Sequence, residues 1–245
     1  MRAISEGVSL IRLPLPSRHG LRILMYHTVG ASAYGDHLGL NTITMERFRK
    51  HVDILAKMLT TKLLPINITE NELKIAITFD DGYADNLYHV APLLAEHGLP
   101  FTVFVTSDFV RKKKPGFLSP VELKKLSQMP GATIGAHSRT HCHLTECSNE
   151  NLRIELQESK NYLENLIGQP VTSLSYPYGA VDMRVREAAK SAGYQIGTCS
   201  RFDINLPNQD QLILNRCVIL SEDTPRVLHQ KLQGEWDWYR WLSAY

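Results

Sequence analysis

The chain has 245 residues, of which 43% are hydrophobic and 21% charged, and its formal net charge is +2. A chain of this length can bury one sizeable core, so we expect a single domain over residues 1–245. The near balance of charges argues against nucleic acid as a partner. No run of residues approaches the roughly 20 apolar positions of a membrane span.

The start of the chain does not have the pattern of a signal peptide, because Glu6, Arg12 and several prolines interrupt its apolar residues. We therefore expect a cytoplasmic location. The chain has four cysteines, which in that setting are expected to be free thiols rather than disulfides: Cys142, Cys147, Cys199 and Cys217.

Apolar runs alternate with segments of helical period along most of the chain, which predicts parallel strands joined by helices. Strands are expected at residues 21–26, 74–79, 101–105, 132–136, 171–176, 194–198 and 212–220. Helices are expected from Thr44 to about Leu59, over 85–97, from Ser119, from Ser148 to Gly168, and over 181–192. About seven strands favour an α/β fold of the closed or nearly closed barrel type over an open sheet.

Polar side chains follow several of these predicted strands. His27, the pair Asp80 and Asp81, and the pair His137 and His141 all stand at such strand ends. Parallel α/β folds place their chemistry beyond the C-terminal ends of the strands, so we expect these residues to converge on one face.

Asp81, His137 and His141 have the composition of a catalytic metal site, since two imidazoles and one carboxylate leave a fourth position open for water. Taken alone, the two histidines would more often be surface residues, and Asp-Asp-Gly would more often be a turn. Their shared place at strand ends favours a site. The side chain of Asp80 diverges from that of Asp81, which leaves it free to move protons.

Three segments, in this order, resemble the successive motifs of the polysaccharide deacetylase family, also called the NodB homology domain or carbohydrate esterase family four. They are Ile77–Gly82 (ITFDDG), His137–His141 (HSRTH) and Tyr176–Gly179 (YPYG). The resemblance covers about residues 21–220 and leaves 221–245 as a helical, aromatic tail. It implies a distorted (β/α)₇ barrel and one divalent metal, commonly zinc, with cobalt, nickel or manganese as alternatives.

The resemblance also assigns roles to residues. It implies that Asp81, His137 and His141 bind the metal, that Asp80 is the general base, and that the backbone N–H of Tyr178 stabilises the oxyanion. Tyr176, Pro177 and Gly179 are expected to contact substrate. Arg216 resembles the arginine of a late family strand end and is expected to orient Asp80 or to bind substrate.

Two histidines are candidates for the general acid. His229 lies in a segment that looks helical, whereas His27 ends the first predicted strand. His27 is similar to the Tyr-His signature of the subgroup that deacetylates poly-N-acetylglucosamine and related exopolysaccharides, in which a circular permutation moves this strand to the start of the barrel. We therefore favour His27, with a purely structural role as the alternative.

Other features depart from the family pattern. The arginine form of the third motif is absent before Pro177, which leaves the partner of Asp80 open. Cys142 and Cys147 fit no known spacing of a zinc ribbon or finger. We expect Arg111–Lys114 to be a solvated loop. We expect the Trp236–Trp241 tail to pack onto the domain, with contact to a membrane surface or a partner as the alternative.

The sequence therefore predicts a metal-dependent N-deacetylase of an N-acetylated glycan. One alternative keeps the same metal site but acts on a small non-sugar amide or an O-acetyl ester. Another is a glycan-binding module without activity, which would not need both a free base and an open metal position.

Overall fold

A computed structural model describes residues 19–63, 68–69 and 71–241, together with the backbone but not the side chains of residues 240 and 241. The expectations about the first 18 residues and the side chain of Trp241 lie outside this part. Within it, none of the helices is long and apolar enough to cross a membrane.

Seven strands form one parallel sheet in the order β8-β7-β6-β5-β4-β1-β9. Their bounds are β1 Gly20–Tyr26, β4 Leu73–Phe79, β5 Phe101–Val105, β6 Ala132–Ala136, β7 Ser173–Ser175, β8 Ile196–Thr198 and β9 Cys217–Val218. Two short strands, β2 (Thr28–Val29) and β3 (Thr42–Ile43), pair beside it. The parallel pairing that was expected from the alternating pattern is therefore present.

The sheet is curled into a half-barrel. Its two edge strands are linked through Leu214, whose N–H donates to Gly197 at 2.8 Å and whose carbonyl accepts from Cys199 at 2.9 Å. Three residues later the same segment pairs with β1 as β9. The fold class is therefore α/β with a curled seven-stranded parallel sheet in a single domain.

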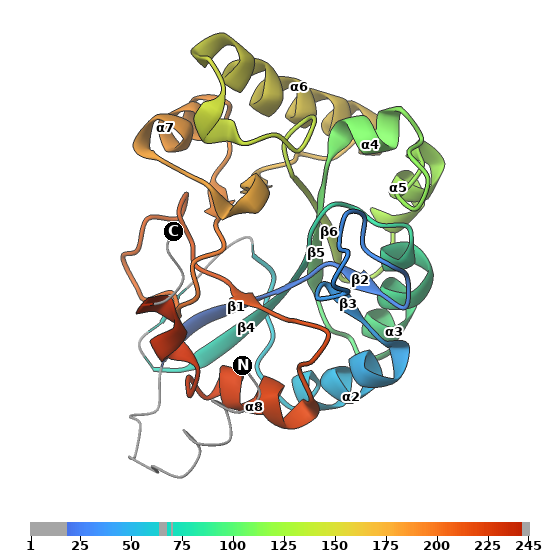
Figure 1. Ribbon diagram of the computed structural model, residues 1–245, viewed down its shortest axis with the longest axis vertical. Helices are drawn as coiled ribbons and strands as arrows, with labels where there is room; N and C mark the ends of the chain where they lie inside the picture. The colour runs from blue at the N-terminus through green and yellow to red at the C-terminus, as the bar shows by residue number, and fades with distance from the viewer. Residues whose placement is uncertain (1–18, 64–67, 70, 242–245) are drawn as a thin grey trace.

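Helices surround this sheet. They are α2 Met45–Leu55, α3 Ala91–Glu96, α4 Ser107–Arg111, α5 Pro120–Leu126, α6 Asn149–Ile167, α7 Met183–Ser191 and α8 Pro225–Leu232, with a π-helix at Asn86–Val90 and 3₁₀ turns at Leu144–Glu146, Pro177–Gly179 and Asp237–Trp241. Figure 1 shows α2 and α8 at the bottom of the view, α3 at the right and α6 and α7 at the top, around the curled sheet. Two of these helices begin or end as predicted: Ser119 caps the start of α5 in a capping box with Glu122, and Gly168 ends α6 at a φ of 69°.

The core has two parts because side chains alternate across each strand. Leu21 and Ile23 of β1 pack inside the curled sheet with Phe104, whereas Leu24 and Tyr26 face the helices. Two details differ from the expectation. Helix α2 ends at Leu55, so Leu59 lies beyond it and is exposed, and the short helix α4 includes Arg111, which was expected to lie in a loop.

The aromatic tail packs back onto the domain as far as it is described. Trp236 and Tyr239 pack against the core between sheet and helices. Asp237 anchors this segment, because its carboxylate accepts hydrogen bonds from the buried guanidinium of Arg22 at 2.8 and 3.2 Å. The predicted packing of the tail is thus observed for Trp236 and Tyr239.

Candidate metal centre

The polar residues at the strand ends meet at one edge of the sheet. Asp80 and Asp81 follow β4, His137 follows β6, and His27 follows β1. The order β6-β5-β4-β1 puts these ends close together, although the residues span more than a hundred positions of sequence. The expected convergence is therefore present.

Asp81 and Gly82 form a sharp turn at the end of β4. Their φ angles are 72° and 82°, in the left-handed region that disfavours side chains. A Cβ on Gly82 would lie 3.1 Å from the side chain of Val105. Glycine at position 82 lets the chain turn against β5, and Asp81 carries the backbone strain that aims its carboxylate at the histidines.

Asp81, His137 and His141 have the arrangement of a metal site. Oδ1 of Asp81 lies 3.4 Å from Nε2 of His137 and 3.3 Å from Nε2 of His141. This oxygen is buried and has no hydrogen-bond partner among the residues that the structure describes. A buried carboxylate oxygen without a partner is costly unless a cation satisfies it, so these three side chains fit a divalent ion.

Hydrogen bonds hold the imidazole of His137 and the turn that carries His141. Nδ1 of His137 lies 2.7 Å from the carbonyl oxygen of Ser175, which leaves Nε2 free to bind a metal. The turn that carries His141 is held by the hydroxyl of Ser138, which accepts from the His141 N–H at 3.0 Å. Buried Glu155 accepts from the N–H groups of Arg139 and Thr140, at 3.0 and 2.8 Å.

Charges adjust the protonation of this cluster. Burial opposes the ionised form of Asp81, but the nearby imidazoles of His137 and His141 outweigh it and hold the pKa of the carboxyl well below its usual value. Burial also opposes the charged form of His137, yet the neighbouring carboxylates of Asp80 and Asp81 raise its pKa.

The structure identifies the hydrogen-bonding partner of Asp80, which the sequence did not decide. The guanidinium of Arg216 donates to both of its carboxylate oxygens, at 2.7 Å each, and the hydroxyl of Ser175 donates to Oδ2 at 3.1 Å. Arg216 is itself fixed by the carbonyl oxygen of Cys199 at 2.9 Å. Burial opposes the charge of Asp80, but Arg216 outweighs it and lowers the pKa of the carboxyl. Of the two roles expected for Arg216, the structure shows contact with Asp80.

The two histidines considered as acids lie in different places. His27 stands directly after β1, and its charge contributes to lowering the pKa of both Asp80 and Asp81. Its Nδ1 is buried without a hydrogen-bond partner in the described structure. His229 is exposed on α8. His27 is therefore the histidine that the fold brings to the metal centre.

The third motif forms a 3₁₀ turn in which only one side chain is exposed. Tyr178, at a φ of 59°, is 54% exposed and stacks on His143 with ring centroids 3.9 Å apart. Tyr176 is fully buried, and its hydroxyl donates to the carbonyl oxygen of Leu212. The side chains of Tyr176 and Pro177 are buried, and Gly179 lies against Ser200. Contact of these three residues with substrate stays a prediction.

The described cysteines are free thiols, as expected. The sulfur atoms of Cys142 and Cys147 lie 3.4 Å apart. The metal-ligand cluster found in the described part of the chain does not include either of them.

Residues 111–114 form the expected solvated segment only in part, because Arg111, Lys112 and Lys113 are exposed whereas Lys114 is half-buried. Arg111 ends α4, and the side chain of Lys114 lies over the rings of Tyr34 and Phe109. The aromatic residues next to this basic run in the sequence were the signal for this packing, which a count of charges does not reveal.

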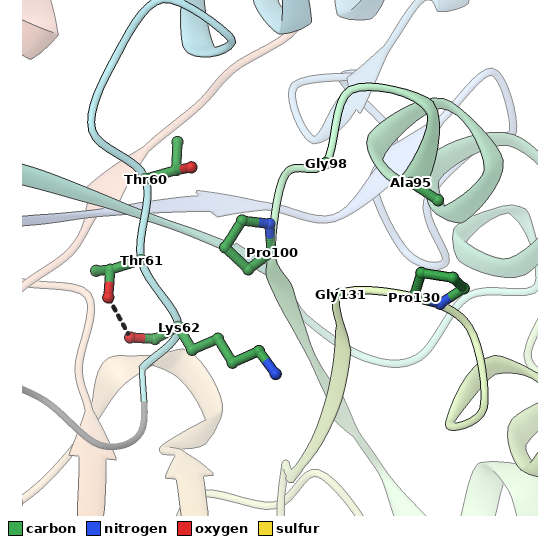
Figure 2. Close-up of a pocket in the computed structure, with 8 residues that line it drawn as sticks. All are labelled: Thr60, Thr61, Lys62, Ala95, Gly98, Pro100, Pro130 and Gly131. Carbon is green, nitrogen blue, oxygen red and sulfur yellow. Dashed lines mark hydrogen bonds between the residues drawn. The ribbon is translucent and has the colours of Figure 1, made fainter.

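A cavity of about 750 Å³ lies away from the metal centre. Figure 2 shows its lining, which includes Pro100 before β5, Gly131 before β6, and Lys62. These residues precede the strands and so lie at the opposite edge of the sheet from the histidines. Lys62 is the one ionisable side chain in its described lining. This cavity therefore does not offer acid–base groups like those of the metal centre.

Comparison with known proteins agrees with the motif order. The family model described as "Polysaccharide deacetylase" matches residues 67–197, which include Asp80, Asp81, both histidines and the Tyr176–Gly179 turn. The chain belongs to the polysaccharide deacetylase family. Residues 1–66 and 198–245, with His27 and Arg216, lie outside the matched segment.

Curated relatives of this deacetylase family are moderately similar in sequence. The Bacillus subtilis protein YxkH, named as a polysaccharide deacetylase, is 28% identical over 80% of this chain and 70% of its own length. A peptidoglycan-N-acetylglucosamine deacetylase of Bacillus cereus is 32% identical over 52% of this chain, and the match spans 57% of that enzyme.

Solved deacetylase structures share the fold. The Streptococcus pyogenes deacetylase PplD, solved in complex with acetate, superimposes with a TM-score of 0.77 at 21% identity and covers 88% of this chain and 99% of its own. IcaB from Ammonifex degensii gives a TM-score of 0.74 at 21% identity, over 87% of this chain and 97% of its own. At this identity the likeness concerns the fold.

Proposed function

We propose that this protein is a metal-dependent hydrolase that removes acetyl groups from the nitrogen of an N-acetylated sugar, within a polysaccharide, an oligosaccharide or a lipid-linked glycan precursor. The observation that carries the proposal is the buried, unpartnered Oδ1 of Asp81 between two imidazoles, beside a second aspartate held by an arginine. A binding protein would need neither the second aspartate nor its clamp.

Zinc is the ion we propose, because a site of two nitrogens and one oxygen suits it. Bound there, it would polarise the acetyl carbonyl and make an adjacent water acidic near neutral pH. Asp81, His137 and His141 would hold it. Oδ2 of Asp80 lies 4.0 Å from Nε2 of His137, which places this carboxylate beside the ligands rather than among them.

Asp80 is the proposed general base. Its lowered pKa keeps it ionised at neutral pH, so it can accept the proton of the attacking water. Arg216 and Ser175 fix its two oxygens, so the base cannot swing toward the metal ligands. The proton then stays on a carboxylate whose position is set by three hydrogen bonds.

His27 is the proposed general acid, since an amide nitrogen must gain a proton before it can leave as an amine. It lies on the β1 side of Asp80, opposite β6 and its histidines. We also propose that this chain is circularly permuted relative to chitin-deacetylase-like members, with the His27 strand moved to the start. The backbone N–H of Tyr178 is the proposed donor to the acetyl oxygen as negative charge develops on it.

The sugar substrate is favoured by the names of relatives, which include peptidoglycan-N-acetylglucosamine and chitooligosaccharide deacetylases. The same residues could hydrolyse a small non-sugar amide or an O-acetyl ester, because a fold does not fix its substrate. The exposed ring of Tyr178 beside His141 offers an apolar face to a sugar, which supports the glycan.

Acetate release is the test of this proposal. The zinc-loaded protein is assayed on N-acetylglucosamine oligomers, on a simple aliphatic acetamide and on an O-acetyl ester, with Asp80→Asn as the inactive reference. We expect the oligomers to have the highest kcat/KM. Faster turnover of the acetamide or the ester would replace the sugar with that substrate class, and no acetate from any of them would contradict hydrolase activity.

A further inference from the structure

A cavity of about 300 Å³ lies next to the metal centre, and the mechanism above does not use it. Its lining includes Phe109, Lys112, Lys114 and Thr140. Thr140 directly precedes the metal ligand His141, and the ring of Phe109 lies roughly parallel to that of His141 with centroids 6.4 Å apart. The cavity is therefore close enough to hold a sugar attached to the one that reacts.

The side chain of Lys114 is held in place by aromatic rings. Its Nζ lies 3.4 Å from the centre of the Tyr34 ring and 3.7 Å from that of Phe109, with Phe117 at 4.9 Å. Such contacts stabilise an ammonium group but do not neutralise its charge. Phe117 also stacks on Tyr83, with centroids 4.6 Å apart, which fixes the rings to the chain just after Gly82.

The other cations around the cavity already have acidic partners. Nζ of Lys112 lies 2.9 Å from Asp108, and Nε of Arg139 lies 3.5 Å from the same carboxylate. NH1 of Arg139 lies 3.1 Å from Glu158. Asp108 also lines the cavity, so its charge is taken up by these neighbours.

Lys114 differs from them, because none of the ion pairs found in the described residues includes it. It is a positive charge that is half-buried, ordered by aromatic contacts and part of the cavity lining, and the carboxylate whose charge acts on it, Asp81, is a proposed metal ligand. Because the aromatic rings already order this ammonium group, it loses little side-chain entropy when it binds an anion.

We propose that this cavity is a substrate subsite for an anionic group, a carboxylate or a phosphate, on a sugar neighbouring the N-acetylated one, and that Lys114 binds that group. The inference rests on the proposed deacetylase function and narrows its substrate to acidic glycans. Lys114 acts in substrate binding and not in bond cleavage. Lys114 should therefore strengthen the binding only of substrates that carry the anionic group.

The test compares three N-acetylglucosamine oligomers of equal length: one neutral, one with a carboxylate on a neighbouring sugar, and one with a phosphate there. We expect one charged oligomer to be preferred over the neutral one, and the comparison of carboxylate with phosphate tells which anion the subsite takes. Lys114→Gln should lower kcat/KM for the preferred oligomer about tenfold, through KM, and leave the neutral oligomer unchanged.

Two further variants separate this role from a general loss of charge or of folding. Lys113→Gln removes the same charge from the neighbouring exposed residue, and we expect it to keep the preference. Lys114→Arg should keep most of the preference, because it retains the positive charge. High salt should weaken the preference as well.

The outcomes distinguish the subsite from the function on which it rests. Equal kcat/KM for the three oligomers, or an unchanged preference in Lys114→Gln, would overturn the subsite while the deacetylase stands. If none of the oligomers releases acetate, the deacetylase function fails, and calorimetric binding of the same oligomers then decides the subsite. Equal affinities in the wild type, or no loss of affinity in Lys114→Gln, would overturn it.

Discussion

Arg216 donates to both carboxylate oxygens of Asp80, at 2.7 Å each, although 136 residues separate the two in the chain. Asp80 directly follows β4, and Arg216 lies just before β9, two strands away in the sheet. The contact joins the last part of the sheet to the catalytic edge. It fixes the orientation of the carboxylate that we propose as the base.

Replacing Arg216 by lysine tests this clamp. Lysine keeps the positive charge but cannot donate in parallel to both oxygens, so Asp80 would lose its fixed orientation. We expect kcat to fall about 100-fold, in the range of a lost general base, with a small change in KM. Steady-state acetate release measures it. Arg201→Lys, in the same segment but paired with Asn215, is the matched control, and an equal loss there would contradict a specific clamp.

His27→Gln tests the acid. An amide leaving group needs a proton, whereas the nitrophenolate of an activated acetate ester does not. We therefore expect kcat on an N-acetylglucosamine oligomer to fall about 100-fold or more, while hydrolysis of the ester stays within a few-fold of wild type. His229→Gln is the control, because His229 is exposed on α8, and it should change neither rate. Equal loss on the amide and the ester would assign His27 a role other than proton donation.

We expect the ionisation of Asp85 to make the stability of the folded protein depend on pH. Burial raises its pKa to about 7, despite its hydrogen bond from the N–H of Val29 at 2.8 Å. Because this pKa is above that of the unfolded chain, the folded state binds more protons between the two values, and stability falls as pH rises through that window. Asp85 should make the protein about 2 kcal/mol less stable at pH 8 than at pH 5.

Urea unfolding of the wild type and Asp85→Asn at both pH values isolates this contribution, because other groups titrate alike in the two proteins. The variant should lack the loss of about 2 kcal/mol. A pH dependence identical to that of the wild type would show that Asp85 ionises freely.

The buried pair of Arg22 and Asp237 anchors the aromatic tail. Asp237→Asn leaves the guanidinium of Arg22 buried without its counter-ion, so we expect the free energy of unfolding to fall by about 3 kcal/mol. Chemical denaturation followed by tryptophan fluorescence reports the loss. The exposed pair of Lys50 and Glu46 is the control, since Glu46→Gln should leave stability almost unchanged, and a similar small effect of Asp237→Asn would contradict the anchor.

The sequence predicted the parts of the site that depend on local pattern. Asp80, Asp81 and His137 each follow a clear apolar strand, and parallel strands bring such ends together by topology alone. Ser119 and Gly168 also marked helix ends correctly, because capping is a local hydrogen-bonding requirement.

Long-range contacts could not be predicted in the same way. The family resemblance offered orientation of Asp80 as one of two roles for Arg216, but residues near Arg216 in the sequence do not decide between them, because the contact depends on how the edge strand closes the sheet. The motif position of Tyr176 does not reveal that its side chain is buried in the core. Ser175 was missed, although its hydroxyl donates to Asp80 and its carbonyl oxygen lies 2.7 Å from Nδ1 of His137.

Metal titration of acetate release tests the central claim most directly. The chelator-treated protein is given increasing zinc, and acetate from an N-acetylglucosamine oligomer is measured in the wild type and in Asp81→Asn. We predict activity that is absent without metal and saturates at about one equivalent per chain in the wild type, as expected for a single three-ligand site, and that stays near zero in Asp81→Asn. Full activity of the chelated protein, or of Asp81→Asn, would contradict a catalytic metal held by Asp81, His137 and His141.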